Sequence, residues 1–130
     1  MMRILKTKVF AKDAEAHNLT DAALKQAIIE VRCGLVEASL GGNLVKKRLP
    51  ISGRGKSSGL RIILACNAFT ENVFCIYMFA KNETDNISSL QLQQLKKFAK
   101  TLLSLKHSEL EKALKEGQLQ EMMQDDDENI

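Results

Sequence analysis

The sequence predicts an α+β fold: a small curved antiparallel sheet of about four strands, with N-terminal and C-terminal helices packed on one face. Two observations predict it. Three short apolar segments follow one another without a helical pattern between them, which favours antiparallel pairing. Segments with helical spacing and capping residues lie on both sides of these strands. At 130 residues the chain can bury one core, so we expect a single domain over residues 1–118 and an acidic, disordered tail over residues 119–130.

The N-terminal part predicts one strand and one helix. Alternation of side chains over residues 3–10 is typical of a strand with one buried face. Thr20 stands where an N-cap is expected, and Leu19 and Leu24 are spaced as a hydrophobic staple. The helix that follows should end near the glycine pair at 41–42.

Three strands are predicted in the middle of the chain, over residues 43–49, 60–66 and 73–80. The polar segment 67–72 has the length of a hairpin connection between the second and the third of them. Pro50 lies at the end of the first, where it costs no hydrogen bond of the sheet.

Capping patterns announce two C-terminal helices. Ser88 and Gln91 form a capping-box pattern at the start of the longer helix. Ser108 and Glu111 repeat that pattern, and Gly117 should end the short helix that follows.

The charge pattern gives the strongest indication of function. No acidic residue occurs between Glu37 and Glu71. Basic side chains gather there around a glycine- and serine-rich loop at residues 50–59: Lys46, Lys47, Arg48, Arg54, Lys56 and Arg61. Cations held on such a loop suit a polyanion, and phosphate is the expected ligand. A solvated basic face, or phosphate binding without chemistry, is the alternative that this composition leaves open.

Motifs for other chemistries are missing from the sequence. The three cysteines, at positions 33, 66 and 75, form no CxxC pair or Cys/His cluster, so we expect small core side chains in a reducing compartment. His17 and His107 are far in sequence from the basic loop. Because there is no Walker loop, dinucleotide fingerprint or nucleophile elbow, we expect no cofactor and no metal.

The chain also has no apolar stretch near the roughly 20 residues that a membrane-spanning helix needs. Its first residues lack the apolar region of a secretory signal. We therefore expect a cytoplasmic protein that does not contact a membrane.

Strand periodicity relates the candidate site residues to one another. Arg61 shares a strand face with Ile63, and Tyr77 shares one with Lys81. If these strands pair, Arg61 and Lys81 border the same concave surface as Lys56. Such a site can cleave RNA without histidine or metal, because fixed cations stabilise charge on the phosphorane, and a lysine or tyrosine of lowered pKa can move the protons.

Three segments together resemble a known family. LGGNLVKKRL at 40–49, GRGKSSGLR at 53–61 and YMFAKNETDNI at 77–87 resemble the RelE-like toxins of bacterial type II toxin–antitoxin systems, in particular the HigB-type branch. The resemblance runs from about residue 3 to residue 117. It implies a small ribonuclease that cuts messenger RNA, typically in the ribosomal decoding site, and an antitoxin encoded beside it that neutralises it.

The resemblance also implies roles for individual residues. Arg61 is similar to the family's strand arginine that holds the scissile phosphate, and Lys81 to the basic residue that closes the last strand. The chain has no histidine in the site region and no tyrosine near its C-terminal helix, so Tyr77 and Lys56 are the candidates for acid–base chemistry. The expected catalytic set is Arg61, Lys81, Lys56 and Tyr77, and the expected RNA-binding set is Lys46, Lys47, Arg48, Arg54 and Asn82.

Two other functions stay open at this point: a ParE-like inhibitor of DNA gyrase within the same fold, and a non-catalytic RNA-binding or interaction module. The expected partners are messenger RNA on the ribosome and a cognate antitoxin, a helix-turn-helix protein that forms a hetero-oligomer with the toxin. For the acidic tail we expect either inert sequence or a segment that folds back on the basic face as an RNA mimic.

Overall fold

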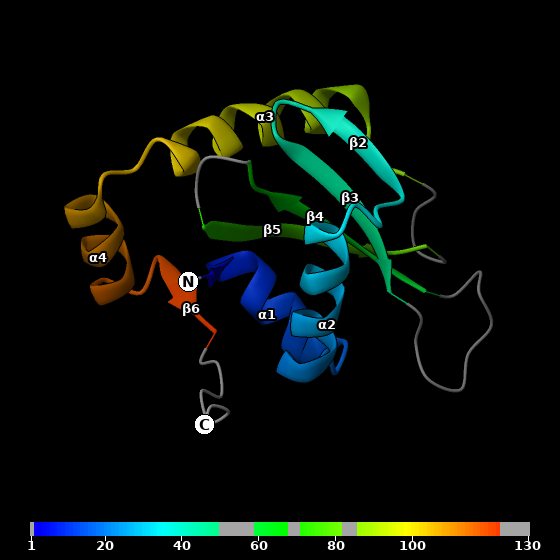
Figure 1. Cartoon of the computed structure of the whole chain (residues 1–130), viewed down its shortest axis with the longest axis horizontal. Helices are drawn as coiled ribbons and strands as arrows, with labels where there is room; N and C mark the ends of the chain where they lie inside the picture. The colour runs from blue at the N-terminus through cyan, green and yellow to red at the C-terminus, as the bar shows by residue number, and fades with distance from the viewer. Residues whose placement is uncertain (1, 50–58, 68–70, 82–85, 123–130) are drawn as a thin grey trace.

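The computed structural model describes residues 2–49, 59–67, 71–81 and 86–122 (Figure 1). Its elements, in chain order, are β1 (Arg3–Thr7), α1 (Lys8–Ala16), α2 (Asp21–Arg32), β2 (Ala38–Gly41), β3 (Leu44–Leu49), β4 (Leu60–Ala65), β5 (Asn72–Ala80), α3 (Ser89–Leu103), α4 (His107–Lys115) and β6 (Leu119–Glu121).

The described residues form one curved, open sheet of six strands in the order β2-β3-β4-β5-β1-β6. Strand β1 runs parallel to β5, and the other neighbouring strands pair antiparallel. The predicted α+β class with a curved sheet is confirmed. The sheet has two strands more than expected, β2 and β6, and its parallel pair was not predicted.

Both faces of the sheet are covered by helices, so the expectation of helices on one face is wrong. One core lies between the sheet and helices α1 and α2, and it includes Ile62 and Leu64 of β4. The other core lies between the sheet and helices α3 and α4, and it includes Ile63 and Ala65 of β4. We call these sides the α2 face and the α3 face. Since side chains alternate along a strand, every residue of β4 can be assigned to one of them.

The N-terminal strand is shorter than predicted because Thr7 begins a helix. Its hydroxyl accepts a hydrogen bond from the backbone N–H of Phe10 at 3.2 Å, which caps α1. Within α1, Phe10 and Ala14 are buried at helical spacing, whereas Val9 is 59% exposed. The helix therefore occupies residues that alternation had assigned to the strand.

The second helix begins as predicted and ends earlier. Thr20 accepts from the N–H of Ala23 at 3.1 Å. The helix ends at Arg32, and Gly34 follows with a φ of +89°, a conformation that glycine adopts readily. Gly41 is instead the last residue of β2, and Gly42 lies in the turn between β2 and β3. A Cβ at Gly42 would lie 3.1 Å from Cγ of Lys96, so a larger residue there would press on α3.

The three central strands follow the predicted segments closely, and β4 and β5 pair antiparallel as expected. One irregularity matters for the site. Ile63 pairs with Tyr77 and Leu64 with Cys75, so Ile76 is the extra residue of a β-bulge. Because of it, Tyr77 lies on the α3 face with Phe79, although Phe74 and Ile76 also face that side.

At the C-terminal end the first cap is confirmed and the second is displaced. Ser88 and Gln91 exchange hydrogen bonds of 3.1 Å at the start of α3. Helix α4 begins at His107, where Glu109 accepts from the N–H of Lys106 at 2.7 Å, so the Ser108–Glu111 capping box is wrong. Gly117 follows α4 with a φ of +80°.

Strand β6 lies within the segment that had been expected to be a tail. It pairs antiparallel with β1, and both Leu119 and Met122 are buried. The sheet therefore extends past residue 118, and the rest of the expected tail, residues 123–130, lies outside the described residues.

Cys75 is buried as expected, Cys66 is half-buried, and Cys33 is exposed, which contradicts its expected place in the core. None of the described helices is long and apolar enough to cross a membrane.

Candidate functional site

The predicted cations are brought together on the α3 face by the register of three strands. Arg48 of β3 pairs with Arg61 of β4, and Lys46 of β3 pairs with Ile63. Ile63 in turn pairs with Tyr77 of β5. Residues that pair directly point to the same face of a sheet, so Lys46, Arg48, Arg61 and Tyr77 share this one.

Arg61 is the centre of the group and is almost completely buried, with 6% of its surface exposed. Its Nε lies 2.9 Å from Oε1 of Glu37 in an ion pair. Its Nη1 donates to the carbonyl oxygen of Gly59 at 3.5 Å. A buried guanidinium needs an opposite charge to compensate its desolvation. Arg61 is thus held in a fixed position and does not move freely at the rim of the sheet.

Glu37 is the site residue that sequence reasoning missed. Its backbone N–H donates to the carbonyl oxygen of Lys46 at 2.8 Å, just before β2 begins. It was visible in the sequence as the last acidic residue before the basic segment. Its contact with Arg61 spans strand β3, and a contact of that kind leaves no local pattern.

Tyr77 and Lys81 lie diagonally on either side of the Arg61 position. Phe79 pairs with Arg61, and Tyr77 precedes Phe79 by two residues. The Cα of Tyr77 is therefore diagonal to the Cα of Arg61, at about 7–8 Å. The Tyr77 ring is half-buried and 6.2 Å from the Phe79 ring, centroid to centroid. Lys81 is exposed directly after β5, and its backbone N–H donates to the carbonyl oxygen of Gly59 at 3.2 Å.

Lys46 lies where β3 meets the start of α3. Its Nζ donates to Oδ1 of Asn86 at 3.5 Å, and the same oxygen accepts from the N–H of Ile87 at 2.9 Å. Lys46 therefore lies on the α3 face, next to the segment that leads into α3.

Lys47 lies on the opposite side of the sheet from the other cations. Its Nζ is 2.7 Å from Oε1 of Glu30 on α2 and donates to the carbonyl oxygen of Leu35 at 2.9 Å. The lysine hydrogen bond lowers the pKa of Glu30. The register explains this placement, because Lys47 pairs with Ile62, which faces α2. Lys47 cannot contact the same ligand as Arg61 without a change in the sheet.

Three residues of the expected set, Arg54, Lys56 and Asn82, lie outside the described residues. In the ranges that are described, no three His, Cys, Asp or Glu side chains gather as a metal site.

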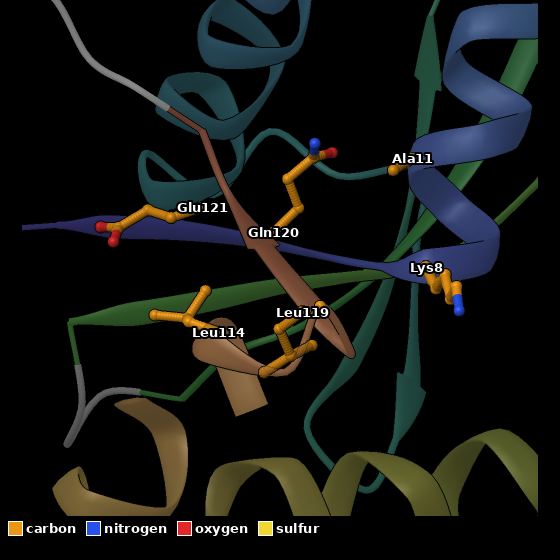
Figure 2. A pocket seen from close by; sticks show the side chains of 7 residues that line it. Lys8, Ala11, Leu114, Leu119, Gln120 and Glu121 are labelled. Atoms are coloured by element: carbon orange, nitrogen blue, oxygen red, sulfur yellow. The ribbon is translucent and has the colours of Figure 1, made fainter. Parts of the chain in front are cut away.

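A cavity of about 380 Å³ lies elsewhere, between α1, the end of α4 and β6 (Figure 2). It is lined by Lys8, Ala11, Leu114, Gly117, Leu119, Gln120 and Glu121. None of the residues predicted for the site lines it.

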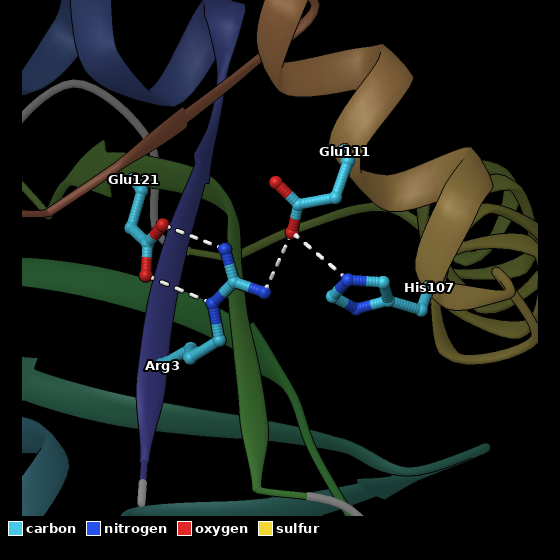
Figure 3. A network of polar contacts seen from close by, with 4 residues as sticks. All are labelled: Arg3, His107, Glu111 and Glu121. Atoms are coloured by element: carbon cyan, nitrogen blue, oxygen red, sulfur yellow. Dashed lines mark hydrogen bonds and ion pairs between the residues drawn. The ribbon is translucent and has the colours of Figure 1, made fainter.

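A polar network joins the elements near this cavity, at the β6 edge of the sheet (Figure 3). Arg3 of β1 donates through two nitrogens to Glu121 of β6, at 2.9 and 2.7 Å, and through a third contact to Glu111 of α4 at 3.0 Å. Arg3 holds the pKa of Glu121 below its usual value. The network joins β1, β6 and α4 and takes no part in the basic group.

Comparison with known proteins places the chain. No curated protein matches it. The family model described as RelE toxin of the RelE/RelB toxin–antitoxin system matches residues 2–122, which include every element from β1 to β6. With the α+β sheet and the basic α3 face, this match identifies the chain as a member of the RelE toxin family, the toxin of a toxin–antitoxin system whose partner is an antitoxin.

Proposed function

We propose that this toxin is an endoribonuclease of the HigB-like branch, which cuts messenger RNA on the ribosome in the cytoplasm without a metal ion. Its cognate antitoxin, a helix-turn-helix protein, inhibits it in a hetero-oligomer. The observation that carries the proposal is the fixed guanidinium of Arg61 on the same sheet face as Arg48 and Tyr77. Membership in the RelE family supports it.

In the proposed reaction, the 2′-hydroxyl of one nucleotide attacks the adjacent phosphorus. The bond from phosphorus to the 5′-oxygen breaks, leaving a 2′,3′-cyclic phosphate and a 5′-hydroxyl. Arg61 stabilises the negative charge that develops on the phosphorane oxygens, and Lys81 stabilises the same charge. One preorganised donor of this kind contributes on the order of two to four kcal/mol to the transition state.

Two proton transfers complete the reaction. One group accepts the proton of the 2′-hydroxyl, and another supplies a proton to the departing 5′-oxygen. Tyr77 is diagonal to Arg61 and therefore close enough to take one of these roles. Lys56 is the candidate for the other.

The remaining cations bind the RNA backbone. Arg48 lies opposite Arg61 on β3, and Lys46 extends the face further along that strand. Arg54 and Asn82 belong to the same proposed set, and their contacts with phosphate would position the RNA without reading its sequence. Lys47 is left out because it faces α2.

The test is to map transcript 5′ ends after induced expression, and then to repeat the experiment with Arg61→Ala. We expect new 5′ ends inside messenger RNA with the native toxin. Their yield should fall about 100- to 1,000-fold with Arg61→Ala, as for the loss of one oxyanion-stabilising donor. Binding of the antitoxin to Arg61→Ala, measured on the purified pair, controls for folding.

One result would favour a different function. If expression arrests growth while transcripts stay intact, and if Arg61→Ala with Lys81→Ala still arrests growth, inhibition of DNA gyrase explains the toxin better. If expression changes neither growth nor transcripts, the chain is a non-catalytic module.

A further inference from the structure

We propose that Glu37 is a positioning residue, which holds the guanidinium of Arg61 in the orientation that phosphate needs; this inference rests on the proposed ribonuclease function. The two residues come from different parts of the sheet. Glu37 precedes the edge strand β2, and Arg61 lies in β4, with β3 between them. Nevertheless Oε1 of Glu37 is 2.9 Å from Nε of Arg61.

Burial makes this contact necessary. The Arg61 side chain is 7% exposed and that of Glu37 is 34% exposed, so the cation lies inside and the carboxylate lies at the rim. Arginine keeps its charge at any physiological pH and cannot escape the cost of burial by losing a proton. Within the described ranges, Glu37 is the acidic residue in ion-pair contact with it.

The contacts also define a direction. A guanidinium is planar, so holding Nε and Nη1 determines where its other N–H groups point. The contact from Nη1 to Gly59 is 3.5 Å long, which is weak for a hydrogen bond. Of these two described contacts, the shorter one with Glu37 therefore supplies the larger constraint.

A second cation makes the carboxylate still more important. Arg48 stands directly opposite Arg61 on the neighbouring strand, and like charges in that arrangement repel. Glu37 offsets this repulsion for Arg61. The carboxylate is well placed to do so, because the backbone of Glu37 is hydrogen-bonded to Lys46, two residues from Arg48 on the same strand.

Positioning and simple charge neutralisation predict opposite effects on the rate of cleavage. If Glu37 only neutralised Arg61, removing its charge would strengthen RNA binding and speed cleavage together. If Glu37 positions Arg61, removing its charge leaves RNA binding unchanged or stronger, but slows cleavage because the guanidinium is no longer aligned with the phosphorane.

The experiment measures cleavage and binding of a model RNA with Glu37→Gln, which keeps the size of the side chain. We expect kcat to fall about 10- to 100-fold, as for a small misplacement of a catalytic group. RNA affinity should stay constant or rise about two- to fivefold at low salt, because one nearby negative charge is gone. Glu37→Asp keeps the charge and should recover part of kcat.

The matched control is Glu30→Gln. It removes the same charge from an ion pair of similar length, but that pair lies on the α2 face with Lys47. We expect kcat and RNA affinity close to those of the native toxin. Thermal melting of each variant shows whether it is folded.

A double variant decides whether Glu37 acts through Arg61. In an Arg61→Ala background, Glu37→Gln should reduce kcat no further. The proposal is overturned if Glu37→Gln raises kcat, leaves it unchanged, or adds its full effect to that of Arg61→Ala. If the native toxin cuts no RNA, the proposed ribonuclease function is wrong, whatever the result for Glu37. Growth arrest by the same variants then shows whether Glu37 and Arg61 are coupled.

Discussion

At the scale of single residues, the position of Arg61 was predictable but its surroundings were not. Alternation along the strand correctly gave its face, since Ile63 and Ala65 share it. The same argument was also compatible with an Arg61 side chain that extends from the edge of the sheet into solvent. The ion pair with Glu37 and the near-complete burial of Arg61 come from strands that are not adjacent. Long-range contacts of this kind are set by the assembled sheet and not by local sequence.

Arg48 and Lys47 are neighbours in the chain but lie on opposite faces of the sheet, so substituting them should have different effects on RNA binding. Arg48→Ala should weaken RNA binding and reduce the slope of log affinity against log salt by about 1, because one phosphate contact is lost. Lys47→Ala should leave both quantities nearly unchanged, since Lys47 pairs with Glu30 on the α2 face. The measurement is a salt titration of RNA affinity. An equal loss with Lys47→Ala would contradict the assignment of the RNA site to the α3 face.

At the scale of elements, two of the three predicted caps form, and the third is displaced by two residues. The caps at Thr20 and Ser88 were predicted, and each forms in the structure. Alternation over residues 3–10 predicted a strand that is too long, because Thr7 ends β1 and caps a helix in the middle of that segment. Strand β6 was missed because three residues are too few to show an alternation of side chains. Its Leu119 is buried by packing against residues that are distant in the sequence.

The buried cap at Thr7 should matter more than the exposed cap at Thr20. The Thr7 hydroxyl accepts from Phe10 and also donates to the carbonyl oxygen of Ile76 at 3.4 Å, and it is buried. We expect Thr7→Val to lower the free energy of unfolding by about 2 kcal/mol, and Thr20→Val by about 1 kcal/mol. Urea denaturation measures both. Equal losses would show that burial adds nothing to the cap.

The contact between β1 and β6 should weaken in acid. Arg3 lowers the pKa of Glu121 in the folded protein, so the pair contributes its full stability above the unfolded value of about 4.3. That contribution is lost as the pH falls through the lower, folded value. The difference in stability between the native protein and Glu121→Gln should therefore be present at neutral pH and disappear in strong acid.

The measurement for this pair is urea denaturation at several pH values. Glu111→Gln is the control, because Glu111 contacts the same arginine from a more exposed position. Its effect should be smaller at neutral pH. A Glu121→Gln difference that persists unchanged in strong acid would contradict the proposed role of the pair.

At the scale of the whole molecule, the sequence predicted the class and the central three strands but not the topology. Segments β3, β4 and β5 are adjacent in the chain, so their antiparallel order followed from short connections. The place of β1 between β5 and β6 did not follow. It depends on parallel pairing with a strand far along the chain, as between Ile4 and Val73, and such pairing carries no short-range signal.

Shortening the chain distinguishes the sheet from the segment after it. Removing residues 119–130 takes away β6 with the buried Leu119 and Met122, so we expect a loss of about 3 kcal/mol or more in the free energy of unfolding. Removing residues 123–130 alone keeps β6 and should change that free energy by less than about 0.5 kcal/mol. Chemical denaturation of both variants measures this. Higher RNA affinity of the shorter deletion at low salt would support the acidic segment as an RNA mimic, and unchanged affinity would exclude it.

The place of β1 between β5 and β6 has a consequence for synthesis of the toxin. Thr7 is made well before its partner Leu119, so β1 cannot have both of its edges paired until β6 has been made. A nascent or prematurely terminated chain therefore lacks the finished sheet. Any activity that needs the complete sheet can therefore begin only after β6 has been made.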